Sequence, residues 1–332
     1  MIRIFWLPVI LAALLICILI VPAGGVDAGI WFRHTQGDRE AGYISDSGLD
    51  LCAESDATTA ERNMTTHEAH ITAAGTEQVS AGSSGKYGKL EKGKVVLVVL
   101  DRIGWKDIYE ADTPNIDRLM DMGAIGLMTT NTAGSRSCNN LYVTMGAGAR
   151  ITGSANSPLA FSSRDVYQGQ RITDLYYQIS GKALPDGAIA NLGIAQVYRN
   201  NLNRPYPVMI GALGTALRQG GYLVAVVGNS DTPDKYRRYL QSMMMDDEGL
   251  VPAGDVGESL IAKDGSRPFG IRVDADAMAR AVDRVWDKAD VIAVEWGDTH
   301  RAEDYRYNLM DYMLEVHRRK ALEDGDAFIG RL

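Results

Sequence analysis

A run of six apolar residues, Val95 to Leu100, constrains this chain most, because it ends directly in the carboxylate of Asp101. An unbroken apolar run rich in β-branched side chains is typical of a strand buried on both faces, as in a parallel sheet. Open α/β sheets bind their ligands outside the carboxyl ends of the strands. The sequence therefore predicts that Asp101 lies where such a fold places its functional site.

Two later apolar segments end in the same way. One leads into Asp231 and the other into Asp298, and the segments are 222–227 and 290–296. Amphipathic helical patterns alternate with them, at 210–218, 274–286 and 305–321. Strands that alternate with helices indicate βαβ units and a parallel sheet. We therefore expect one α/β domain over residues 94–332, with a mainly parallel sheet sandwiched by helices.

Two short motifs follow the first strand. Residues 113–119 read Thr-Pro-Asn-Ile-Asp-Arg-Leu, and residues 146–150 read Gly-Ala-Gly-Ala-Arg. With Asp101 at the end of the preceding strand, these motifs resemble the alkaline phosphatase superfamily, in its phosphoglycerate mutase and phosphodiesterase branch. The resemblance extends from about Lys94 to the C-terminus. It implies an alkaline-phosphatase-like fold that transfers phosphoryl groups from phosphate esters with the help of divalent metal ions.

Metal ligands are expected at the strand ends. The resemblance implies that Asp101 binds a metal, and Asp298 and His300, at the end of the third predicted strand, complete our candidate set. Clustered carboxylates suit hard divalent cations and histidine suits zinc, so zinc, manganese and magnesium all stay open. Strand-end aspartates also cap the helices that follow them. For Asp231, which precedes Thr-Pro, capping is the preferred interpretation.

The superfamily carries its nucleophile at the start of a helix. Counting back from Gly146 by the spacing of the mutase branch reaches Cys138, with Ser137 and Ser135 as alternatives if the register slips. A thiolate at Cys138 would need a helix N-terminus or a nearby cation to lower its pKa. Side chains expected to bind the phosphoryl oxygens of a substrate are Asn139, Arg150 and Arg301.

A second hypothesis is an inert member of the same superfamily. After Asp101 the chain has only His300 and His317, although the two-metal site of the family usually takes three histidines. The final Asp-His strand of the family does not occur before Leu332, so we expect a divergent, C-terminally truncated relative. The sequence thus leaves two functions open. One is a phosphoric ester hydrolase or phosphomutase-like enzyme, and the other is a binding or scaffold domain of the cell envelope.

The N-terminus predicts export. Residues 5–21 form an apolar run without charges that follows Arg3 and is about long enough to cross a membrane. We expect residues 1–28 to be a transmembrane anchor or a cleaved signal peptide, and the polar residues 29–93 to be a flexible linker. Either case places the domain on the extracytoplasmic side of the cell membrane. The net charge of −8, without a basic cluster, argues against nucleic acid as a partner.

Overall fold

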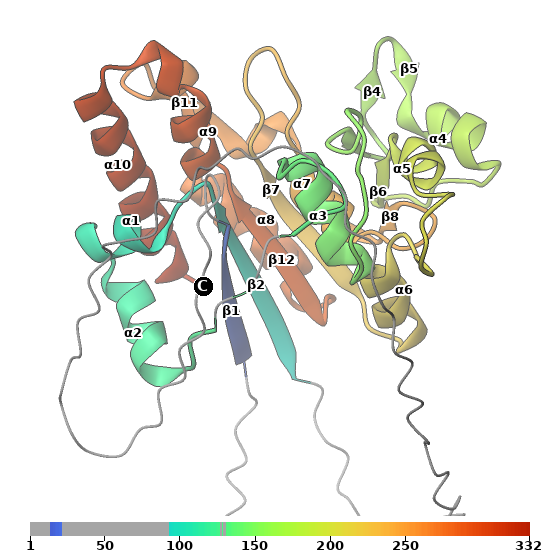
Figure 1. Ribbon diagram of the computed structural model, residues 1–332, viewed down its shortest axis with the longest axis horizontal. Helices are drawn as coiled ribbons and strands as arrows, with labels where there is room; N and C mark the ends of the chain where they lie inside the picture. The colour runs from blue at the N-terminus through green and yellow to red at the C-terminus, as the bar shows by residue number, and fades with distance from the viewer. Residues whose placement is uncertain (1–13, 22–92, 127, 129–130) are drawn as a thin grey trace, which may run out of the picture. The chain divides into compact units, whose positions relative to one another are not determined.

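The computed structural model describes residues 14–21, 93–126, 128 and 131–332. Its main sheet has five strands in the order β1-β2-β12-β7-β9, and every neighbouring pair is parallel (Figure 1). The strands are β1 (Leu14–Val21), β2 (Lys94–Asp101), β12 (Val291–Trp296), β7 (Val224–Asn229) and β9 (Ala253–Asp255). The predicted α/β fold with a parallel sheet flanked by helices is thereby confirmed.

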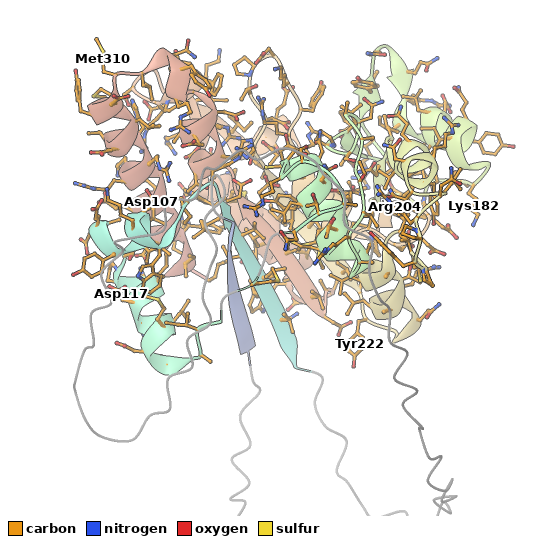
Figure 2. The ribbon with its side chains drawn as sticks, viewed as in Figure 1. Asp107, Asp117, Lys182, Arg204, Tyr222 and Met310 are labelled. Atoms are coloured by element: carbon orange, nitrogen blue, oxygen red, sulfur yellow. The ribbon has the colours of Figure 1, made fainter. Side chains whose placement is uncertain are left out.

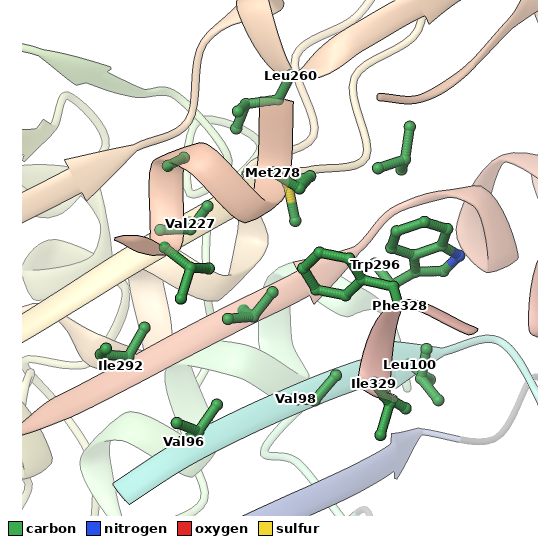
Figure 3. Packing of buried hydrophobic residues seen from close by; sticks show 14 of the residues in the cluster. Val96, Val98, Leu100, Val227, Leu260, Met278, Ile292, Trp296, Phe328 and Ile329 are labelled. Atoms are coloured by element: carbon green, nitrogen blue, oxygen red, sulfur yellow. The ribbon is translucent and has the colours of Figure 1, made fainter. Parts of the chain in front are cut away.

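One face of the sheet packs against the helices α8 and α10. Val96, Val98 and Leu100 of β2 are fully buried on this face, because alternate residues of a strand point to the same side (Figure 3). The rings of Trp296 and Phe328 stack there at 5.3 Å between centroids. The helices that belong to this side are α1 (Trp105–Glu110), α2 (Pro114–Met122), α8 (Ala275–Trp286) and α10 (Asp311–Ile329).

The opposite face carries the remaining residues of the same strands, such as Val99 and Ala293. It packs against α3 (Cys138–Ala147), α6 (Ala212–Gln219) and α7 (Tyr239–Met244). Helices α3 and α7 approach so closely that a Cβ atom at Gly146 would lie 2.4 Å from the carbonyl oxygen of Met243. The first glycine of the Gly-Ala-Gly segment is therefore required by helix packing.

Residues 151–207 show no clear period in the sequence, and the structure explains why. They contribute short elements with a separate small core around Phe161, Ile172 and Tyr176. These elements are β3 (Ala160–Ser162), β4 (Val166–Tyr167), β5 (Gln170–Arg171), α4 (Ile172–Ser180), β6 (Ile189–Asn191) and α5 (Ile194–Asn200), with β6 also pairing β8 (Leu250–Val251). Lys182, labelled in Figure 2, forms an ion pair at 2.6 Å with Glu248, which lies between α7 and β8.

Residues 256–310 contain α8 and β12, and short elements lie before α8 and after β12. A two-stranded antiparallel ribbon is accompanied by three turns of 3-10 helix, and one α-helix follows β12 directly. These elements are η1 (Glu258–Leu260), β10 (Ile261–Lys263), η2 (Pro268–Gly270), β11 (Ile271–Val273), α9 (Asp298–Asp304) and η3 (Arg306–Asn308). The helix predicted over 305–321 therefore starts later, at Asp311, and continues to Ile329.

The predicted transmembrane segment differs from the structure where the two overlap. Residues 14–21 form β1, a strand that pairs in parallel with β2 from Leu14 opposite Lys94 to Val21 opposite Asp101. An apolar run rich in Ile, Leu and Val suits a sheet as well as a bilayer, because β2 satisfies its backbone groups. In the described part of the chain, no helix has the length and apolar character needed to cross a membrane. Residues 1–13 and 22–92, with most of the predicted linker, lie outside the described residues.

The Thr-Pro-Asn segment is held in place by the last helix. Helix α2 begins at Pro114, and its first turn faces the buried carboxylate of Asp326 in α10. Asp326 accepts hydrogen bonds from the backbone N–H of Ile116 at 2.7 Å and from the side chain of Asn115 at 2.8 Å. A carboxylate in this position satisfies N–H groups that the helix itself leaves without partners.

We expect Asp326→Ala to lower the free energy of unfolding by about 2 kcal/mol, because it leaves buried donors at the start of α2 unsatisfied. Urea denaturation of the purified chain measures the change. The control is Asp121→Ala at an exposed position of α2, which should change stability by less than about 0.5 kcal/mol. Equal effects of the two substitutions would show that Asp326 does not cap α2.

Candidate metal centre

Three side chains that can bind a metal converge at the carboxyl end of β2. Asp101, Cys138 and His300 each offer a ligand atom, and these atoms lie within 4.8 Å of one another. Nδ1 of His300 is 2.8 Å from Oδ2 of Asp101, and Sγ of Cys138 is 3.8 Å from the same oxygen. All three side chains are buried, with exposed fractions of 2%, 7% and 0% respectively.

Three separate elements bring these side chains together. Asp101 is the last residue of β2, and Cys138 is the first residue of α3. His300 lies in the first turn of α9, which follows β12, the parallel neighbour of β2. One turn further along α3, the hydroxyl of Tyr142 also donates to Oδ2 of Asp101, at 3.3 Å. Because β2 and β12 are parallel, Asp101 at the end of β2 and His300 after the end of β12 lie at the same edge of the sheet.

Without a bound metal, the carboxylates around His300 favour its protonated form, and a metal ion would bind the neutral ring in place of that proton. Burial lowers its pKa, but the charge of Asp101, hydrogen bonding to Asp101 and Asp304, and Cys138 together raise the pKa well above its usual value. Its Nε2 atom is buried and faces Oδ2 of Asp304 at 3.5 Å. Burial raises the pKa of Asp304, yet His300 and Arg237 outweigh that effect and lower it to about 2.

Glu295 lies in β12, fully buried next to this group. Burial and the negative charge of Asp101 raise its pKa to about 7, although the hydroxyl of Ser230, the charge of His300 and the backbone N–H of Leu240 act in the opposite direction. A carboxyl group with this pKa takes up a proton near neutral pH. Glu295, with a pKa of about 7, and Asp304, with a pKa of about 2, therefore differ in how readily they hold a proton.

The structure places two of the predicted site residues in a different cluster. Asp298 accepts hydrogen bonds from the backbone N–H of Val273 at 3.0 Å and from Nη1 of Arg301 at 2.9 Å. The other guanidinium nitrogens of Arg301 donate to the backbone oxygens of Asp231 and Asn229. Asp298 is outside the group of convergent ligand atoms. These contacts tie α9 to β11 and to the end of β7, so they give both residues a structural task.

The remaining predicted residues lie at or beyond the ends of α3. Ser137 is the N-cap residue of α3, and its hydroxyl makes no capping hydrogen bond. Asn139, in the first turn, has a buried Oδ1 atom without a hydrogen-bond partner. Arg150 is exposed beyond the other end of the helix. Ser137 and Asn139 therefore lie next to Cys138 at the start of α3, whereas Arg150 lies beyond the other end of the helix.

The sequence did not identify Arg102 and Tyr142 as residues of the centre. It also did not predict that Asp304 faces His300. A spacing of four residues was the available signal for two of them, because Tyr142 follows Cys138 and Asp304 follows His300 at that interval in a helix. Arg102 directly follows Asp101, and no helical or strand period singles it out.

Comparison with known proteins gives no assignment, because no protein-family model, no curated protein and no solved structure matches this chain. The function must therefore be argued from the site. Its donor set of one carboxylate, one thiol and one imidazole is composed of side chains that zinc uses. The residues present thus fit a divalent metal ion.

Proposed function

We propose that this protein is a metal-dependent phosphoryl-transfer enzyme acting on phosphate monoesters, with zinc held by Asp101, Cys138 and His300. The convergence of these three ligand atoms at the carboxyl edge of a parallel sheet carries the proposal. Among the three metals that the sequence left open, zinc suits thiolate and imidazole ligands, whereas magnesium and manganese prefer oxygen. Three protein ligands leave a fourth position open, as catalytic zinc sites require.

The chain itself provides the groups that the reaction needs. A bound zinc ion would polarise a phosphoryl oxygen of the ester. With Cys138 as a ligand, Ser137 becomes the nucleophile, because its hydroxyl lies at the start of α3 and is not used for capping. Its Oγ attacks phosphorus, the bond from phosphorus to the ester oxygen breaks, and the serine proton passes to the departing alcohol. Water then attacks phosphorus, breaks the new bond to Oγ and releases phosphate, which restores the serine hydroxyl.

A second candidate is a non-catalytic envelope domain with a structural zinc ion. The burial of all three ligands supports it, because structural zinc sites are closed whereas catalytic sites admit substrate. Both candidate functions use the same metal centre, but only the first predicts that the protein turns over a substrate. The two functions are therefore separated by one assay on the metal-loaded protein.

The assay measures hydrolysis of a generic aryl phosphate by the zinc-loaded chain. We expect turnover by the wild type and a loss of at least about 100-fold in Asp101→Ala, because the variant loses a metal ligand. The matched control is Asp255→Ala, which removes the carboxylate that ends another parallel strand, β9, and should keep full activity. Zinc binding without turnover would favour the structural candidate, and absence of zinc binding would overturn both.

We also propose that the domain acts on the extracytoplasmic side of the cell membrane. The support is the sequence pattern of residues 5–21, an apolar run after Arg3 that is typical of exported proteins. For residues 14–21, export through this run and a place in β1 are alternatives. A reporter that works only outside the cytoplasm, fused after Gly85, should be active. Activity of a cytoplasmic reporter at the same position would contradict export.

A further inference from the structure

The backbone of Arg102 is strained next to the candidate metal centre. Its φ angle is +61°, and among the described residues only two others that are not glycine, Gln168 and Phe269, have a positive φ. This left-handed conformation is unfavourable for residues with a Cβ atom, and such strain gathers at functional sites. Arg102 directly follows Asp101, so the strained residue adjoins a proposed metal ligand.

The guanidinium group of Arg102 lies among the side chains of the centre. Its electrostatic neighbours are Asp101, Cys138 and Asp304. An arginine side chain is not deprotonated in proteins, so the group is a cation. Its Nε atom is buried and has no hydrogen-bond partner. A buried N–H of a cation without an acceptor indicates a place for an anion.

The other charges near the centre are already matched in pairs. Asp101 faces His300 at 2.8 Å, and Asp304 pairs with Arg237 at 2.6 Å. In the described part of the chain, Arg102 has no ion pair with a carboxylate within 4.0 Å. Arg102 is therefore attracted by Asp101 and Asp304 but forms a close ion pair with neither of them.

We propose that Arg102 anchors the substrate by binding the phosphoryl oxygens of the ester next to Asp101, Cys138 and His300. This inference rests on the proposed function and deepens it. A guanidinium presents a planar fork that matches two phosphoryl oxygens, which lysine cannot do. A fork beside a metal ion calls for an anion with several free charged oxygens. The arrangement therefore favours phosphate monoesters over diesters.

Glycine at position 102 gives a sharp test, because it adopts a positive φ without strain. Arg102→Gly removes the guanidinium while relieving the backbone, and Arg102→Lys keeps the charge without the fork. Inorganic phosphate is titrated calorimetrically into the zinc-loaded full chain of each form. We expect Arg102→Gly to weaken phosphate binding at least about tenfold and Arg102→Lys to weaken it less. Zinc affinity should stay within about twofold in both variants, because Arg102 is not a metal ligand.

Stability distinguishes an anchor from a structural residue. If Arg102 binds substrate, Arg102→Gly should unfold at a urea concentration no lower than that of the wild type. A lower midpoint, unchanged phosphate binding in Arg102→Gly or absence of phosphate binding by the wild type would each overturn the inference. Phosphate binding that depends on Arg102 in a protein without turnover would support the anchor and contradict the enzyme. Turnover that survives Arg102→Gly with an unchanged KM would support the enzyme and contradict the anchor.

Discussion

Replacing His300 with alanine is expected to weaken zinc binding at least about 100-fold, or about 2.7 kcal/mol. The imidazole is fully buried, and Nδ1 lies 2.8 Å from a carboxylate oxygen of Asp101, another proposed ligand. Its removal leaves one carboxylate and one thiol, which are too few to hold zinc tightly. Calorimetric titration of the metal-free chain with zinc measures the loss.

His317→Ala is the matched control for that titration. His317 lies in α10, is partly exposed and does not belong to the convergent ligand group. Its substitution should leave zinc affinity within about twofold of the wild type. If both variants bind zinc as tightly as the wild type, the metal must be held elsewhere, and the centre built on Asp101 would be wrong.

Glu295→Gln is expected to remove a pH dependence of stability of about 3 kcal/mol. Burial raises the pKa of Glu295 from 4.5 to about 7, so the folded chain keeps this proton where the unfolded chain releases it. In that window the folded state binds more protons, and stability must fall as pH rises. The contribution is fully present below pH 4.5 and is lost as pH rises through about 7. Glutamine mimics the protonated carboxyl at every pH, so the variant lacks this pH-dependent contribution to stability.

The measurement is urea unfolding of metal-free protein at pH 5 and pH 8. Relative to the wild type, Glu295→Gln should be more stable at pH 8 than at pH 5 by about 2.5 kcal/mol. Glu258→Gln, at an exposed position, serves as the control and should show no such difference. A constant offset between Glu295→Gln and the wild type at both pH values would contradict the buried, protonated state of Glu295.

The parallel sheet was predictable because most residues of its central strands are buried. The segments that became β2, β7 and β12 are mostly apolar, as strands covered on both faces are, although β12 includes Glu295. The same property misled the interpretation of residues 14–21, where apolar character alone cannot separate a sheet strand from a membrane span. Short elements such as β3 and β6 lack a detectable period because two or three residues are too few to show one.

The site was predictable only in part. Asp101 and His300 follow from strand ends, and Cys138 follows from its spacing to Gly146, so the three convergent residues were all singled out from the sequence. The sequence did not predict that these three residues form one group, because Asp298 was expected among the ligands in place of Cys138. Whether a strand-end carboxylate faces a metal or a neighbouring arginine depends on side-chain contacts between distant segments. Those contacts are decided by packing, which no local pattern encodes.

The most direct test of the metal centre is X-ray absorption at the zinc edge of the zinc-loaded chain. We predict one sulfur at about 2.3 Å, from Cys138, together with nitrogen and oxygen ligands at about 2.0–2.2 Å, from His300 and Asp101. In Cys138→Ser the sulfur contribution should disappear while the lighter ligands remain. A wild-type spectrum with nitrogen and oxygen ligands alone, or a sulfur signal that survives Cys138→Ser, would contradict the centre proposed here.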